Sequence, residues 1–253
     1  RRQRQMCIRD SLNFVKQLSY GVTLAGVIQL IFLFLVSLKF YKPSLVLKLK
    51  KDNKVKFFFK KLIPSIFSSG VTQINILIGT IIASFETGAV SYLYYADRIY
   101  QINLAIAGIA VGTVSLPALS RTFKEKNIKK LTNIQSKSFE LSLLLSIPAS
   151  FGLIIASEEI VNALFGYGSF SKEDVKLTAD ALKYFGYGVP AFALVKILSN
   201  FFFARDNTKT PFYISAGMVV INITISLSLF SSIGFIIIPI ATSVSTWIGV
   251  LVY

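Results

Sequence analysis

The 253-residue chain is 53% hydrophobic and only 15% charged, with a mean hydropathy of +0.63 and a net charge of +15. Soluble domains carry about 25% charged residues, so an ordinary soluble globule is excluded, as is a disordered chain. The sequence has no His and one Cys, Cys7. It therefore lacks the residues for His-based acid–base catalysis, Cys–His nucleophiles and an internal disulfide. This composition predicts a membrane protein with several spanning segments.

Both ends of the sequence suggest a piece of a longer protein. Residues 1–11, RRQRQMCIRDS, are polar and basic and resemble translated sequencing-adapter read-through, so we expect them to be non-native. They do not form a signal peptide, because no small-residue cleavage site follows the first apolar run. At the other end the chain stops at Tyr253, inside an apolar run.

Seven apolar stretches are long enough to form membrane helices. A hydrocarbon core of about 30 Å needs about 20 apolar residues in a helix. The predicted fold class is therefore all-α, a polytopic helix bundle. The stretches lie near residues 18–38, 62–85, 88–119, 138–158, 174–203, 211–231 and 234–253.

Local signals mark the start of one stretch and irregularities in two. Ser171 and Asp174 have the spacing of a capping box ahead of the fifth stretch. Proline inside a helix removes a backbone hydrogen bond, so Pro148 predicts a kink in the fourth stretch. In the fifth stretch, kinks or local unwinding are expected at Gly186, Gly188 and Pro190.

Lys and Arg gather in alternate loops. The opposite loops carry Lys172 and Lys176 beside acidic residues. Cytoplasmic loops of membrane proteins are enriched in Lys and Arg, so the Lys-rich loops are predicted to be cytoplasmic. Because the cations mark loop ends, nucleic acid is not expected as a partner. The basic residues of the Lys-rich loops are Lys39, Lys42, Lys48, Lys50, Lys51, Lys54, Lys56, Lys60, Lys61, Arg121, Lys124, Lys126, Lys129, Lys130, Lys137, Arg205 and Lys209.

Small and polar residues recur at helical spacing on two stretches. On the third, Gly108 and Gly112 form a GxxxG pattern, which lets another helix approach closely. We expect one face of this helix to carry Arg98, Gln101, Ala105, Gly108 and Gly112. On the second stretch, a similar face is expected at Ser65, Ser69, Thr72, Gly79 and Ala83, with Gln73 and Asn75 beside it.

Arg98 is the charge that most needs an explanation, because it lies about 15 Å along the third stretch. An unpaired positive charge at such a depth costs from about 3 to more than 10 kcal/mol. One interpretation is a structural Arg, paired with Asp97 or with carbonyls of another helix, although Asp97 points about 100° away on a helix. The other is an Arg facing a polar cavity, where its planar fork binds phosphate or pyrophosphate.

Two runs carry a family resemblance. IIAS…GAVSYLYYADRIYQ begins at the end of the second stretch and ends at Gln101, and GIAVGTVSLPALSR, in the third stretch, ends at Arg121. LFGYGSFS at 164–171 and LVKILSNFFFARDNTKTP at 194–211 support it. The sequence resembles the lipid II flippase family MurJ (MviN) of the multidrug/oligosaccharidyl-lipid/polysaccharide exporter superfamily. The resemblance covers nearly everything after residue 11.

The resemblance implies a fold of fourteen helices, two six-helix lobes followed by two helices. Residues 12–38 would be the last helix of the first lobe, 39–61 a Lys-rich cytoplasmic linker, and 62–253 the second lobe. It implies alternating-access transport of lipid II from the inner to the outer leaflet of the bacterial cytoplasmic membrane. The expected partners are the bilayer, the lipid-linked anionic oligosaccharide, and the missing first lobe and final two helices. No enzyme activity is expected.

The resemblance also implies roles for individual residues. Arg98 matches the second-lobe cavity arginine of the YADR motif, with the substrate pyrophosphate as its partner. Asp97 and Gln101 are the other candidate substrate-binding residues. Some relatives have Pro and Gly where this chain has Asn103 and Ala105, so we expect the third helix to kink less there.

Certain family members are thought to hold sodium with carboxylates of the second lobe. The aligned positions here are Gly79 and Ser226, which leaves neutral oxygens such as those of Asn222 and Thr242. We therefore expect no metal site and no cofactor. The candidate polar residues of a cavity are Gln73, Asn75, Asn222 and Thr242.

Two other functions remain open from the sequence. One is export of a different lipid-linked polysaccharide precursor by a related transporter. The other is a membrane scaffold that recruits cell-wall enzymes without transporting anything. A scaffold predicts that Arg98→Ala has no effect, whereas a transporter predicts a severe loss.

Overall fold

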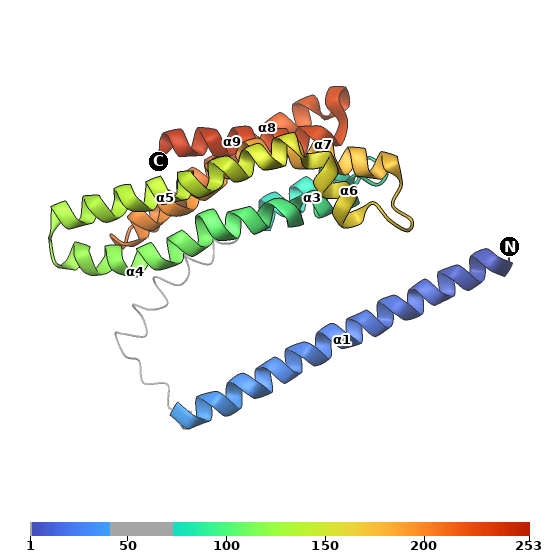
Figure 1. The fold of residues 1–253 in the computed structure, drawn as a ribbon, viewed down its shortest axis with the longest axis horizontal. Coiled ribbons are helices and arrows are strands. Elements are labelled where there is room, and N and C mark those ends of the chain that lie inside the picture. Colours follow the sequence, from blue (N-terminus) through green and yellow to red (C-terminus); the bar gives the residue numbers. More distant parts are fainter. Residues whose placement is uncertain (1, 41–72) are drawn as a thin grey trace. The chain divides into compact units, whose positions relative to one another are not determined.

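The computed structural model describes residues 2–40 and 73–253, and every element in those ranges is helical (Figure 1). The chain divides into two units, residues 1–53 and 54–253, each of which is described by itself. Most of the predicted linker 39–61, and residues 62–72 with Ser65, Ser69 and Thr72, lie outside the described residues.

The first unit contains the single described helix α1, Arg2–Phe40. Its segment Ser19–Lys39 is long and apolar enough to cross a membrane, in agreement with the first predicted stretch. The helix begins within residues 1–11, which are helical from Arg2 onward. Whether these residues are native stays a prediction.

The second unit begins, in its described part, with a short apolar helix at Gln73–Ala83. Four stretches that follow are long and apolar enough to cross a membrane: Ala89–Lys124, Ile128–Ile155, Lys172–Phe203 and Lys209–Val252. The elements are α3 (Ala89–Leu104), the π-helix η1 (Ala105–Ala110), α4 (Val111–Lys124), α5 (Ile128–Ile155), α6 (Ser157–Phe165), α7 (Lys172–Phe203), α8 (Lys209–Ile233), the 3₁₀ turn η2 (Gly234–Ile236) and α9 (Ile237–Val252).

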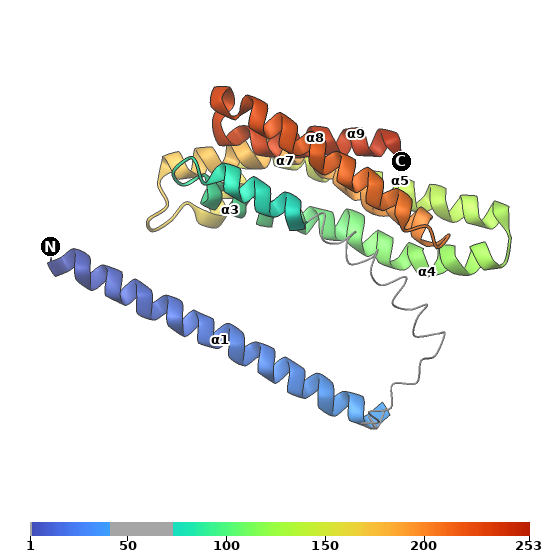
Figure 2. The ribbon, with the colours of Figure 1, turned by 180° about the vertical axis from the view of Figure 1, so that it is seen from behind.

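The last stretch is a hairpin of two helices. At Gly234 the backbone adopts a φ of 74°, a conformation that glycine reaches without steric cost. Figure 2 shows α8, which precedes this turn, and α9, which follows it, side by side. The prediction of separate helices near 211–231 and 234–253 is confirmed. The largest difference from the predicted bounds is in α5, which begins at Ile128 and not near residue 138. The Asn127 side chain caps its start by accepting a hydrogen bond from the Lys130 N–H at 3.0 Å.

Helix α7 is the centre of the second unit, packed against α3, α5 and α9. It is the most buried of the candidate spanning helices. The predicted capping box at its start is confirmed: the Asp174 N–H donates to the Ser171 hydroxyl at 3.1 Å, and the Ser171 N–H donates to the Asp174 carboxylate at 2.7 Å. The chain is thereby held at the point where the central helix begins.

The predicted local unwinding of α7 is wrong, because α7 is one continuous α-helix from Lys172 to Phe203. Pro190 lacks the N–H that would donate to the Gly186 carbonyl. The hydroxyl of Ser150 on α5 donates to that carbonyl instead, at 2.7 Å. A side chain from a neighbouring helix thus satisfies the group that the proline leaves free, so the helix continues through Pro190. The other half of the expectation, a kink at this point, stays a prediction.

The π-helix η1, which was not predicted, interrupts the third stretch directly after Asn103 and Leu104, while the expectation of a smaller kink than in some relatives stays a prediction. A single π turn holds one residue more than an α turn, so it rotates everything after it by about 100°. Before η1, the buried residues of α3 are Ala89, Ala96 and Ile99. After it, the buried residues of α4 are Val111, Gly112, Ser115, Leu119 and Thr122.

The same rotation divides the single face predicted for Arg98, Gln101, Ala105, Gly108 and Gly112. Arg98 and Ala105 are exposed, whereas Gly108 and Gly112 are buried. One helix therefore presents its arginine to one side and its glycines to another.

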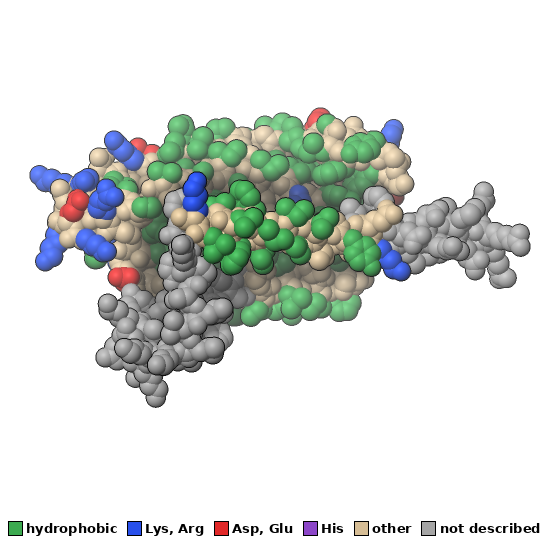
Figure 3. Space-filling view, turned by 90° about the horizontal axis from the view of Figure 1, so that it is seen from below, with side chains coloured by type: hydrophobic (Ala, Val, Ile, Leu, Met, Phe, Trp, Pro, Cys, Tyr) green, Lys and Arg blue, Asp and Glu red, His purple; other side chains and the backbone are tan. Residues whose placement is uncertain are grey.

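The charged loops of the second unit lie at opposite ends of the helices. The α4–α5 and α7–α8 connections are at one end in Figure 1, and Figure 3 shows the blue side chains gathered there. The α5–α6–α7 region, with Glu158, Glu159 and Glu173, lies at the other end. The predicted alternation of basic and acidic loops therefore corresponds to two ends of the bundle.

Candidate functional site

Arg98 lies on α3, and its contacts are with Tyr94, one turn earlier on the same helix. Its Nη2 donates a hydrogen bond to the Tyr94 hydroxyl at 3.1 Å. Its guanidinium carbon lies 4.8 Å from the centre of the Tyr94 ring, within the range of a cation–π contact. Both contacts are with Tyr94, a neutral side chain, and the hydrogen bond uses one of the five guanidinium N–H donors. The spacing of four residues between Tyr94 and Arg98 in YYADR indicates such a contact, which was not predicted.

Asp97 is held by different residues. Gln101 Nε2 donates a hydrogen bond to the Asp97 carboxylate one turn along α3. The Tyr100 hydroxyl interacts with the same carboxylate, and its ring packs against Phe185 of α7 at 4.7 Å between ring centres. The sequence-based alternative of an Arg98–Asp97 ion pair is not what the structure shows, because Asp97 is engaged with these neutral partners.

Within the described part of the second unit, no helix covers the face of α3 that carries Arg98. On this face Tyr94 is 54% and Ile102 is 61% exposed, whereas Ala96 and Ile99 on the opposite face belong to the core. A guanidinium facing hydrocarbon costs from about 3 to more than 10 kcal/mol. The position of Arg98 is therefore suited to a polar cavity or to a contact with another part of the protein, and not to lipid.

The two glycines of the GxxxG pattern lie against α7. A Cβ built on Gly108 would be 3.1 Å from the Ala193 Cα, so the two backbones are in direct contact. A Cβ on Gly112 would be 2.8 Å from the Asn200 Nδ2, which donates to the Gly112 carbonyl at 2.9 Å. These contacts hold η1 and the start of α4, which continue the helix that carries Arg98, against α7.

Asn222 and Thr242 lie together between α8 and α9. The Asn222 Nδ2 donates to the Thr242 hydroxyl at 3.0 Å, and the Asn222 Oδ1 accepts from Ser226 at 3.1 Å. Asn222 is 7% exposed. Gly79 lies against α9, since a Cβ on it would be 3.7 Å from the Ile238 side chain. The pair forms a helix–helix contact, and a role in lining a cavity stays a prediction.

The other two candidate cavity residues lie on the short helix Gln73–Ala83. Gln73 is exposed and Asn75 is half-buried. In the described part of the chain, neither side chain forms a hydrogen bond with Asp97, Arg98 or Gln101. In residues 2–40 and 73–253, no group of three or more His, Cys, Asp and Glu side chains lies close enough to hold a metal ion.

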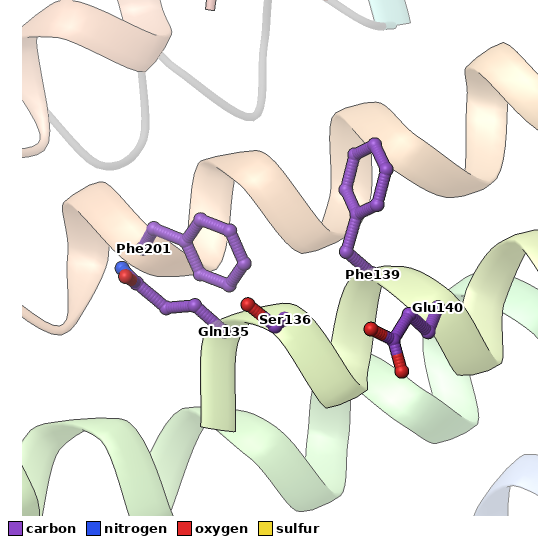
Figure 4. A pocket seen from close by; sticks show the side chains of 5 residues that line it. All are labelled: Gln135, Ser136, Phe139, Glu140 and Phe201. Carbon is purple, nitrogen blue, oxygen red and sulfur yellow. The ribbon is translucent and has the colours of Figure 1, made fainter. Parts of the chain in front are cut away.

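A pocket of about 280 Å³ lies between α5 and α7, away from Arg98 (Figure 4). Phe201 of α7 forms one wall, and the other lining residues come from α5: Gln135, Ser136, Phe139 and Glu140. Figure 4 shows Phe139 and Glu140 pointing to different sides of α5. None of the predicted substrate-binding residues lines this pocket.

Comparison with known proteins gives consistent results. The family model described as lipid II flippase MurJ matches residues 6–253, beginning inside the eleven residues expected to be non-native. Relatives described as probable lipid II flippase MurJ include those of Rhizobium meliloti (strain 1021), 38% identical over 249 residues, and Rickettsia prowazekii (strain Madrid E), 38% identical over 230 residues. The alignments cover 96% and 91% of this chain but 45% of each relative. The chain thus spans about half the length of the curated relatives it matches.

Solved structures show the same relationship. A lipid II flippase MurJ in an inward closed conformation matches with a TM-score of 0.74 at 27% identity, over 90% of this chain and 48% of that one. An outward-facing transporter of the MATE family in the MOP superfamily matches with a TM-score of 0.65 at 18% identity, over 75% of this chain and 42% of that one, which is a likeness of fold alone. From the family model, the relatives and the fold together, the chain belongs to the lipid II flippase MurJ family.

Proposed function

We propose that the full-length protein containing this chain moves lipid II from the inner to the outer leaflet of a bacterial cytoplasmic membrane by alternating access. Arg98 binds the pyrophosphate of the substrate during this movement. The observation that supports the proposal most directly is the position of Arg98. Its guanidinium lies on an uncovered face of a membrane helix and is contacted by Tyr94, a neutral residue.

The chemistry of the two groups fits. A guanidinium donates two parallel hydrogen bonds to phosphate oxygens, which fixes both the distance and the orientation of the anion. In surroundings of low dielectric constant this interaction is stronger than in water. The site then holds the charged part of a lipid-linked substrate while its hydrocarbon chain remains in the bilayer.

The proposal includes an orientation for the second unit. The end that carries the α4–α5 and α7–α8 connections faces the cytoplasm, because its Lys and Arg residues follow the positive-inside distribution. The end with α6 and the start of α7 faces the outside. A Cys introduced at Lys126 would then react with a membrane-impermeant thiol reagent only after the membrane is opened, whereas one at Lys172 would react in intact spheroplasts.

The decisive experiment is rescue of a bacterium depleted of its own lipid II flippase, with the full-length gene as wild type and as Arg98→Ala. We expect the wild type to restore growth and Arg98→Ala to fail at equal membrane abundance. Arg205→Ala, which removes an exposed arginine from the α7–α8 connection, is the matched control and is expected to rescue.

The other two outcomes would change the proposal in different ways. Rescue by Arg98→Ala would keep lipid II transport but remove Arg98 from the substrate path. Failure of the wild type at good expression would favour a related exporter or a scaffold. These two are separated by testing rescue of strains that lack exporters of other lipid-linked precursors.

A further inference from the structure

Two opposite charges stand next to each other on α3, and each is bound by a different neutral residue. Arg98 turns toward Tyr94, four residues earlier. Asp97 turns toward Gln101, four residues later, and toward Tyr100. Both Asp97 and Gln101 are half-buried, while Arg98 is exposed. The two side chains thus have different hydrogen-bond partners although they are adjacent in sequence.

This difference matters because a carboxylate and a phosphate compete for the same donors. A carboxylate binds the guanidinium fork through the same two parallel N–H groups that a phosphate uses. If Asp97 were released from Gln101 and turned toward Arg98, its negative charge would offset the positive charge that attracts an anion. A bound amide leaves Asp97 hydrogen-bonded without neutralising Arg98.

We propose that Gln101 is a positioning residue that holds Asp97 away from Arg98 and thereby keeps the arginine available for a diphosphate. Gln101 acts through Asp97 and does not touch the substrate. This inference rests on the proposed function, since it assumes that Arg98 binds the pyrophosphate group. In this inference Asp97 is an anion that would compete with the substrate for Arg98, and its hydrogen bond to Gln101 prevents this competition.

The test measures binding of a polyprenyl diphosphate to the full-length protein in nanodiscs, with the corresponding polyprenyl alcohol as the uncharged probe. The variants are Gln101→Ala, Asp97→Asn, the double variant with both changes, and Arg98→Ala. Gln135→Ala removes another half-buried glutamine, on α5, and is the matched control. Thermal unfolding in the same nanodiscs checks that every variant is folded.

We expect Gln101→Ala to weaken diphosphate binding about tenfold, the factor that corresponds to about 1.4 kcal/mol. Asp97→Asn in the same chain should restore binding to within about twofold of the wild type, because an amide does not compete for the guanidinium. Neither change should alter binding of the alcohol, and Gln135→Ala should behave as wild type.

Three results would overturn the inference. They are an unchanged affinity in Gln101→Ala, a loss in Gln101→Ala that Asp97→Asn does not restore, and an equal loss for diphosphate and alcohol. The second result would mean that Gln101 contacts the substrate itself. The proposed function fails separately, if the wild type binds diphosphate no better than alcohol or if Arg98→Ala binds it as well as the wild type.

Discussion

The polar group between α8 and α9 and the polar group on α3 are built in opposite ways. Asn222, Thr242 and Ser226 bond to one another across two helices, and Asn222 is buried. Arg98 and Asp97 bond to residues of their own helix, and the arginine is exposed. The first group completes its bonds inside the unit and stabilises it. The second leaves charge available to something outside the unit.

The largest expected effect that tests this difference is that of Arg98→Lys. Lysine keeps the charge but loses the planar fork, so one of two charge-assisted hydrogen bonds to a diphosphate is lost. Such bonds contribute about 1.5–3 kcal/mol, which corresponds to roughly a ten- to hundredfold loss of polyprenyl diphosphate binding in nanodiscs. The unfolding temperature should not change. Arg205→Lys is the control, and full binding by Arg98→Lys would contradict pyrophosphate recognition by the fork.

The next effect concerns how the arginine helix is fixed to α7. Gly112→Ala places a Cβ 2.8 Å from the Asn200 Nδ2 and disturbs its bond to the Gly112 carbonyl. Overpacking of this kind costs about 1–3 kcal/mol, measured as a lower thermal unfolding midpoint of the full-length protein in detergent. Gly217→Ala meets nothing within 4 Å and is the matched control. Equal behaviour of the two variants would show that the contact at Gly112 is loose.

The smallest effect is expected at the buried group. Asn222→Leu removes the bonds to Thr242 and Ser226, and interhelical hydrogen bonds in membrane proteins contribute about 0.6–1.7 kcal/mol. The variant should be slightly less stable and should bind polyprenyl diphosphate as the wild type does. Thr224→Ala, which loses a hydroxyl on the exposed side of the same helix, is the control. A binding loss without a stability loss would place Asn222 in the substrate path.

The sequence predicted the helices well because their signals are local. Apolar length located the spans, and the spacing of Ser171 and Asp174 located the start of α7. The failed prediction at Pro190 has a non-local cause. The bond that satisfies the Gly186 carbonyl comes from Ser150, 36 residues earlier, and depends on the register between two helices.

The same distinction applies to the candidate site. Arg98 was identified because a charge inside an apolar run is costly wherever the helix packs. The partners of Asp97 could not be identified, because Arg98, Tyr100 and Gln101 are all within reach of its side chain. The choice between them depends on rotamers and on how Tyr100 packs against α7.

The π-helical turn at Ala105–Ala110 has a consequence for how relatives are aligned with this chain. It amounts to one inserted residue between Arg98 on α3 and Gly112 on α4, in a segment that contains Gly108. A relative that lacks the turn needs one residue fewer there to keep both groups facing their present neighbours. An alignment without a gap in this segment would pair residues that lie on different sides of the helix, so the gap belongs between residues 105 and 110.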